Sequence, residues 1–168
     1  AHIGHFAGLT SLGLEIMNLK DIPVYARARM EKFLMESPFL ADLIKNNVIK
    51  IRLIEEYESI YVGPFVVEAF NVPHRNELSE TVGFRVRGDR KRIVYLPDID
   101  SWEGWEANLY SLVRQNDFLL IDGTYYDKNE IRTRDVNKIP HPDIRQSMNV
   151  LSLLDKEERE KIYFTHFN

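Results

Sequence analysis

Four short, mostly apolar runs in this sequence are each followed within two residues by a histidine or an aspartate. Their β-branched and aromatic residues predict β-strands. Each run and its polar residue form a pair: Phe65–Val72 with His74, Arg92–Leu96 with Asp98, Phe118–Ile121 with Asp122, and Ile162–Thr165 with His166. Ligands of layered α/β folds collect where strands give way to loops, so the pattern predicts one site for metal binding or proton transfer.

Segments with helical spacing alternate with the strands and predict a mixed α/β protein with helices outside its sheets. The expected helices are Leu9–Asn18, Arg27–Glu36, Pro38–Lys45, Trp102–Gln115 and Pro142–Leu154, followed by a short helix that Asp155 and Glu158 begin as a capping box. The other expected strands are Ile22–Tyr25, Val48–Ile54 and Thr81–Arg87, with a hairpin turn at Gly88-Asp89. The 168 residues contain no linker or repeat, which favours a single domain over residues 1–168.

Composition excludes several classes of function. The net charge of −4 disfavours a purely electrostatic nucleic-acid binder, so nucleic acid is not the favoured partner. No apolar run reaches the length of a membrane helix, and no membrane partner is expected. The chain has no cysteine, so any metal must be held by His, Asp or Glu, and we expect a cytoplasmic protein. The oligomeric state is left unpredicted.

The remaining histidines stand in distinctive places. His2 and His5 lie three residues apart at the start of the chain, a spacing at which two imidazoles can face one metal. His141 lies between Pro140 and Pro142. Any one of these polar residues alone is more simply explained as a satisfied group at a strand end or in a loop. Five histidines and two aspartates together favour a site.

These residues resemble the metallo-β-lactamase fold, whose hallmark is H-x-H-x-D-H. Ala1-His2-Ile3-Gly4-His5 matches this motif from its second position. The later metal motifs of the family resemble Val72-Pro73-His74, Tyr95-Leu96-Pro97-Asp98 and Tyr163-Phe164-Thr165-His166, in the same order. Within the family, Leu119–Tyr125 and Tyr95–Asp100 are similar to the pyrroloquinoline quinone biosynthesis protein B group and, more distantly, to the tRNA 3′-end processing endonuclease.

The resemblance implies an αββα sandwich whose N-terminal strands are missing from this chain, and therefore an incomplete domain. It implies that His2 and His74 bind a first metal, that His5 and His166 bind a second, and that Asp98 bridges the two. The metal is then one or two Zn²⁺ ions, with Fe²⁺ as the alternative. Hydroxide formed on the metal would attack an ester, amide or phosphodiester bond. The expected partner is a small-molecule or phosphodiester substrate.

Gly4 departs from the family because it stands where an aspartate is usual. His5, His166 and Asp98 then form the two-histidine, one-carboxylate set of non-haem iron oxygenases, so an oxygenase of the quinone-biosynthesis kind is the alternative function. A non-catalytic metal-binding or partner-binding relic is a third.

Asp122 and His141 are the candidate catalytic residues, as a pair in which the carboxylate orients the imidazole to protonate a leaving group. The alternative is that Asp122 caps a turn with Gly123 and Thr124. The basic run from Arg85 to Arg92 is expected to be a solvated strand face rather than a phosphate contact.

Overall fold

The computed structural model of the chain describes residues 2–130, 135 and 139–167, so Ala1 of the histidine motif lies outside the described residues. Two compact units make up the chain. Unit 1 is Ala1–Glu55 with Asn76–Glu80, and unit 2 is Glu56–Arg75 with Thr81–Asn168. Because compact units do not by themselves define domains, the single domain stays a prediction.

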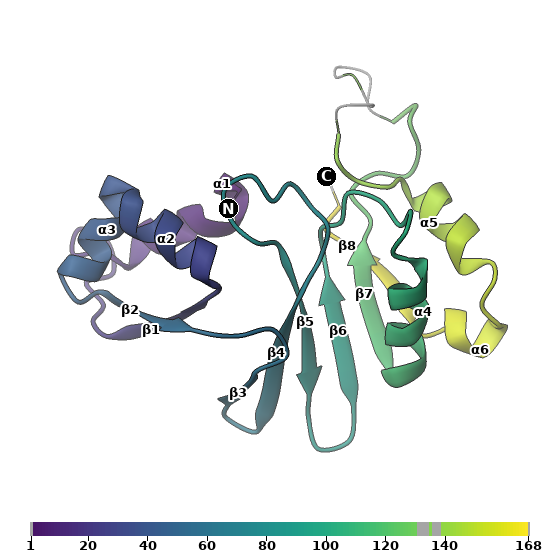
Figure 1. Ribbon diagram of the computed structural model, residues 1–168, viewed down its shortest axis with the longest axis horizontal. Helices are drawn as coiled ribbons and strands as arrows, with labels where there is room; N and C mark the ends of the chain where they lie inside the picture. The colour runs from purple at the N-terminus through teal and green to yellow at the C-terminus, as the bar shows by residue number, and fades with distance from the viewer. Residues whose placement is uncertain (1, 131–134, 136–138, 168) are drawn as a thin grey trace. The chain divides into compact units, whose positions relative to one another are not determined.

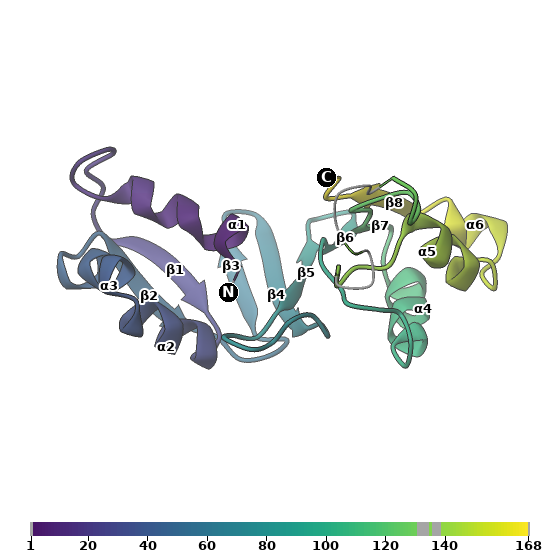
Figure 2. The same ribbon diagram turned by 90° about the horizontal axis from the view of Figure 1, so that it is seen from above.

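Unit 1 is a two-stranded parallel sheet covered on one side by helices (Figure 1). Its elements are α1 (Ile3–Phe6), the 3₁₀-helix η1 (Ala7–Leu12), β1 (Ile22–Ala26), α2 (Ala28–Glu36), α3 (Pro38–Lys45) and β2 (Ile49–Leu53). The helices lie on the same face of the sheet. Figure 2 shows α2 and α3 along one edge of that face and the α1–η1 segment along the opposite edge. Leu34, Leu40, Leu43, Val48 and Ile49 form its buried core.

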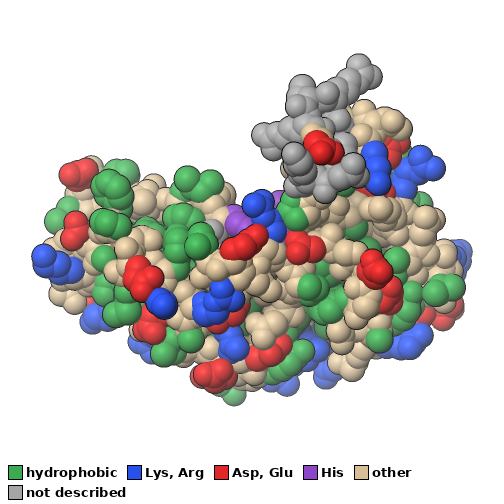
Figure 3. Space-filling model, turned by 45° about the horizontal axis from the view of Figure 1, so that its top comes forward, with side chains coloured by type: hydrophobic (Ala, Val, Ile, Leu, Met, Phe, Trp, Pro, Cys, Tyr) green, Lys and Arg blue, Asp and Glu red, His purple; other side chains and the backbone are tan. Residues whose placement is uncertain are grey.

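The surface of unit 1 exposes several large hydrophobic side chains, which Figure 3 shows as green atoms on this part of the chain. They include Ile3, Leu14, Ile16, Met17 and Phe39, of which Phe39 is 84% exposed.

Unit 2 contains a six-stranded sheet in which the strands follow one another in chain order. The strands are β3 (Ser59–Val62), β4 (Phe65–Asn71), β5 (Val82–Arg87), β6 (Arg92–Leu96), β7 (Phe118–Asp122) and β8 (Ile162–Thr165). Neighbours pair antiparallel from β3 to β6, whereas β6, β7 and β8 are parallel. The carboxyl ends of these last three strands therefore share one edge of the sheet, and polar residues behind them are brought together.

Helices α4 (Glu106–Gln115), α5 (Ile144–Leu151) and α6 (Lys156–Arg159) lie beside β7 and β8 (Figures 1 and 2). The core beneath them includes Val94, Leu109, Leu119 and Ile121, none of which is measurably exposed. Trp102 is buried among these residues, and its indole N–H donates to Ser147 Oγ at 2.8 Å. The layered α/β class predicted from the sequence is confirmed.

Three expectations about secondary structure were wrong. The helix predicted over Leu9–Asn18 is instead η1, which ends where Gly13 adopts an extended backbone. The helix predicted from Trp102 begins only at Glu106, because Gly104 has a φ of +73° that no α-helix accommodates. Strand β3 was missed, although its Ser-Ile-Tyr-Val run and the following Gly63-Pro64 turn carried a signal.

Two local predictions are confirmed. Gly88 N–H donates to the Lys91 carbonyl at 2.9 Å and closes the β5–β6 hairpin. The Asp155 carboxylate accepts from Glu158 N–H while the Glu158 side chain accepts from Asp155 N–H, which is the predicted capping box. No helix within the described residues is long and apolar enough to cross a membrane.

Candidate metal centre

Asp98 is the centre of the polar cluster in unit 2. It follows β6 after Pro97 and is buried. Its Oδ1 lies 3.9 Å from His74 Nε2, 3.9 Å from His141 Nδ1 and 3.7 Å from His166 Nε2. One carboxylate oxygen thus has three imidazole nitrogens around it, although the three histidines come from distant parts of the chain.

His74 is held by contacts on both its ring and its backbone. Only 2% of the residue is exposed, and its Nδ1 lies 3.0 Å from Asp100 Oδ1. The Thr81 hydroxyl donates to the His74 carbonyl at 2.6 Å, and Asp100 N–H donates to the Pro73 carbonyl at 2.8 Å. A carboxylate therefore lies beside Nδ1 while Nε2 lies toward Asp98, and metal-binding histidines commonly have a carboxylate near their other ring nitrogen.

Asp122 ends β7 and has no exposed surface. Its Oδ2 lies 2.6 Å from His141 Nδ1 and accepts from Ile99 N–H at 3.2 Å. Its Oδ1 accepts from Thr124 N–H at 3.0 Å and from the Thr124 hydroxyl at 2.8 Å. The Asp122 carboxylate therefore caps the turn at Thr124 and also contacts His141. The geometry is compatible both with a turn cap and with an Asp122–His141 pair.

His141 is positioned by its backbone as well as by Asp122. The Tyr125 hydroxyl donates to the His141 carbonyl at 3.0 Å. Burial lowers the pKa of His141, but its hydrogen bond to Asp122 and the negative charges of Asp122, Asp98 and Asp100 outweigh burial. The net result is a pKa raised above the ordinary histidine value, which favours the protonated ring.

His166 follows β8 and completes the cluster. Its backbone has a φ of +61°, a left-handed conformation that is uncommon for a residue with a side chain. Its Nδ1 lies 3.2 Å from the Thr124 hydroxyl. The β7 and β8 ends approach closely at Gly123, whose N–H donates to the Thr165 carbonyl at 2.8 Å and where a Cβ would lie 2.8 Å from Phe164 Cβ.

The structure thus brings together five of the seven candidate residues within unit 2: His74, Asp98, Asp122, His141 and His166. The other two belong to unit 1. His2 precedes α1 and His5 lies within it, with ring centroids 6.4 Å apart.

Sequence reasoning missed two residues of the cluster. The Thr124 hydroxyl lies within 3.3 Å of Asp122, His141 and His166 together. Asp100 contacts His74 as described above. The only signal for Asp100 was its position two residues after Asp98, and Thr124 was considered only as a turn residue.

The donor set of unit 2 fits a divalent metal. His74, Asp98 and His141 offer ligand atoms that all lie within 4.8 Å of one another, and so do Asp122, His141 and His166. Two ligands about 2.1 Å from a tetrahedral zinc lie roughly 3.4 Å apart, close to the separations around Asp98 Oδ1. Imidazole and carboxylate are ligands of zinc and of iron.

A model of the beta-lactamase superfamily domain matches residues 1–167. Similar solved structures include Zn²⁺-bound PqqB from Methylobacterium extorquens, with 24% identity and a TM-score of 0.71, covering 99% of this chain and 57% of that one. The metallo-beta-lactamase fold protein YhfI from Bacillus subtilis has 16% identity and a TM-score of 0.64, covering 99% and 61%. Yeast PDE1 has 17% identity and a TM-score of 0.65, covering 99% and 55%.

The chain therefore spans little more than half the length of these three proteins. None of the curated proteins compared with the chain matches it.

Proposed function

Because this chain belongs to the beta-lactamase superfamily, we propose that it is a metal-dependent hydrolase whose centre holds one or two Zn²⁺ ions. The matching family model and the likeness of fold confirm the metallo-β-lactamase-like α/β fold that the sequence predicted. The hydrolase activity and the metal are our proposal.

The single observation that carries the proposal is the arrangement around Asp98 Oδ1, with three imidazole nitrogens at 3.7–3.9 Å. Buried carboxylate and imidazole groups in such a cluster are expensive to desolvate unless they are paired or bind a cation. The Zn²⁺ in the PqqB structure supports zinc as the first metal to test.

In this proposal His74, Asp98 and His166 of unit 2 hold the metal. Asp100 Oδ1 lies 3.0 Å from His74 Nδ1, so its negative charge favours the Nδ1-protonated tautomer, in which Nε2 is available to the metal. A bound divalent metal supplies a water molecule of lowered pKa and withdraws charge from the bond to be cleaved.

Asp122 and His141 supply the proton for the leaving group. The buried Asp122 carboxylate accepts from His141 Nδ1, so it fixes the tautomer and the orientation of the ring. The raised pKa of His141 keeps the imidazole protonated closer to neutral pH, as a general acid requires. Such an acid suits an ester, amide or phosphodiester, whose leaving group must gain a proton.

A non-haem iron oxygenase is the second candidate, because the proposed ligands His74, Asp98 and His166 are also two histidines and one carboxylate. The Asp122–His141 pair favours the hydrolase. A protonated imidazole that a carboxylate orients can donate a proton to a poor leaving group, which is a requirement of hydrolysis. The two-histidine, one-carboxylate oxygenase site requires open metal positions and no such proton donor.

The decisive experiment is metal analysis after anaerobic purification, followed by assays of the zinc-loaded and iron-loaded chain. We expect zinc-dependent cleavage of one of three substrates: bis-p-nitrophenyl phosphate, p-nitrophenyl acetate or an anilide. Asp98→Asn should abolish the activity, and Asp117→Asn, a matched carboxylate change at the other end of β7, should preserve it. Oxygen consumption by the iron form without hydrolysis by the zinc form would establish the oxygenase, and a folded chain that retains no metal would establish a relic.

A further inference from the structure

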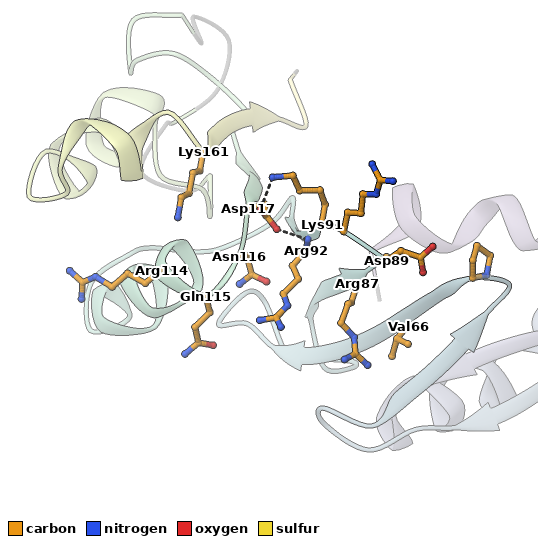
Figure 4. A pocket seen from close by; sticks show the side chains of 13 residues that line it. Val66, Arg87, Asp89, Lys91, Arg92, Arg114, Gln115, Asn116, Asp117 and Lys161 are labelled. Carbon is orange, nitrogen blue, oxygen red and sulfur yellow. Dashed lines mark hydrogen bonds and ion pairs between the residues drawn. The ribbon is translucent and has the colours of Figure 1, made fainter.

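A second polar site lies at the opposite end of the same sheet. It is a pocket of about 720 Å³ (Figure 4). The pocket is lined by the β5–β6 hairpin from Arg87 to Arg92, by Arg114–Asp117 at the end of α4 and in the turn before β7, by Lys161 before β8, and by Pro64 and Val66. We call it the hairpin pocket. Its volume lies within the roughly 300–1,000 Å³ that is usual for pockets that bind small molecules.

The hairpin pocket is strongly cationic. Its lining has six cationic and two acidic side chains, a local surplus of four positive charges in a chain whose net charge is −4. The sequence suggested a solvated strand face for the basic run. Arg87 and the residues from Asp89 to Arg92 are indeed exposed. The structure also gathers four cations of that run around a concavity and adds two from other elements: Arg87, Arg90, Lys91 and Arg92, with Arg114 and Lys161.

The nearby carboxylates neutralise only part of this charge. Asp117 accepts from Lys91 Nζ and from Arg92 N–H, both at 2.8 Å, which fixes the hairpin against β7 (Figure 4). Arg114 pairs with Glu158 at 3.0 Å. Within residues 2–130, 135 and 139–167, no carboxylate lies within ion-pair distance of the guanidinium groups of Arg87, Arg90 or Arg92.

The positive charges of Arg87 and Arg92 repel each other when no anion lies between them. They are directly opposite each other in the β5–β6 register, and their side chains extend in the same direction in Figure 4. Like charges directly opposite on adjacent strands are destabilising. An anion bound between the two guanidinium groups would remove this repulsion and accept paired hydrogen bonds from each planar group.

The hairpin pocket is separate from the candidate metal centre. Strands β6, β7 and β8 run from the pocket to the centre, with Arg92, Asp117 and Lys161 at their amino ends. Asp98, Asp122 and His166 lie at their carboxyl ends. Five residues of strand span roughly 17 Å, so a small anion cannot contact both sites.

We propose that the hairpin pocket binds the phosphate groups of a small phosphorylated molecule, at a site distinct from the metal centre. Phosphate is the favoured chemistry because guanidinium groups recognise its oxygens in pairs, and because the cation surplus suits more than one negative charge. The pocket's size favours a small molecule over a nucleic-acid strand.

Isothermal titration calorimetry with inorganic pyrophosphate tests the proposal, using chain freed of metal so that the probe has no metal to chelate. The double variant Arg87→Gln/Arg92→Gln should raise the dissociation constant at least tenfold. Arg145→Gln, which removes one exposed arginine of α5 that pairs with Asp127, should change it less than twofold. The single variants Arg87→Gln and Arg92→Gln give the same comparison if the double variant does not fold.

A second arm separates the two sites. His74→Ala should leave pyrophosphate binding unchanged, because His74 belongs to the metal centre. Arg87→Gln should also leave the thermal midpoint equal or higher without pyrophosphate, while reducing the rise that pyrophosphate causes. Three results would each overturn the proposal. Pyrophosphate does not bind to the wild type, or its binding is lost in His74→Ala but kept in the arginine variants, or only a single-stranded oligonucleotide binds.

Discussion

His141 Nδ1 and Asp122 Oδ2 lie 2.6 Å apart, although 19 residues separate them in the chain. The carboxylate is fully buried at the end of β7 and also caps the turn that contains Thr124. The imidazole is therefore oriented by a group that is itself fixed by two backbone N–H donors, from Ile99 and Thr124.

We expect Asp122 and His141 to behave as one unit in catalysis. Asp122→Asn and His141→Ala should each lower the rate on the best substrate by about 10²-fold or more, because general acid catalysis contributes on that order. The double variant should be no slower than the slower single variant, since groups that act together are non-additive. Losses that multiply in the double variant would show that the two residues act independently.

Asp98 and His74 should be needed to retain metal. Asp98→Asn and His74→Ala remove ligands, so zinc per chain, measured by inductively coupled plasma mass spectrometry, should fall below half of the wild-type value. Asp117→Asn is the control, since this carboxylate contacts Lys91 and Arg92 rather than the cluster. Unchanged zinc in the Asp98 variant would contradict its proposed role as bridging ligand.

The metal-free protein should lose stability from the His141–Asp122 pair as pH rises. The pKa of His141 is raised in the folded protein, because its interactions with the neighbouring carboxylates outweigh the effect of burial. This contribution is therefore fully present below the unfolded pKa of about 6.5 and is lost as pH rises through the folded pKa.

Urea denaturation of the wild type and of His141→Ala from pH 5.5 to pH 9 measures this effect. The difference in free energy of unfolding between the two proteins should shrink as pH rises. A difference that is constant across the range would argue against the raised pKa.

We expect His166 to bind metal while its backbone is held in a strained left-handed conformation. Its φ of +61° is tolerated better by Asn than by most residues, and a left-handed backbone costs about 1–2 kcal/mol in an ordinary residue. His166→Asn should keep the thermal midpoint close to wild type while lowering zinc retention, and His166→Ala should lower both. A stability loss equal in the two variants would mean that the backbone conformation is not the cause.

Gly4→Asp should strengthen binding of a second metal, because the family resemblance places a carboxylate ligand at this position. The backbone accepts the change, since Gly4 lies in α1 and a Cβ there meets no described atom within 4 Å. We expect about tenfold tighter second-metal binding, or about 1.4 kcal/mol, in a zinc titration against a competing chelator. Gly8→Asp, at an equally open position, is the control. A wild type that already binds two ions equally would refute this prediction.

Local pattern explains how much of unit 2 could be predicted. The strands β4 to β8 were predicted to within about two residues, because they are rich in the β-branched and aromatic residues that favour strands. The helix expected from Leu9 was wrong because Gly13 adopts an extended backbone and ends the helical segment at Leu12. Strand β3 was missed because a strand of four residues is too short for its alternation of apolar and polar residues to stand out.

The sequence by itself determined which polar residues stand at strand ends, since strands, turns and caps depend on neighbours a few residues away. Only the tertiary structure decided that Asp98 lies among three histidines, that Asp100 contacts His74, and that Thr124 reaches both His141 and His166. It also turned the basic run into the wall of a pocket. These relationships depend on the parallel pairing of β6, β7 and β8, which brings together side chains that are tens of residues apart and is set by the packing of the whole sheet.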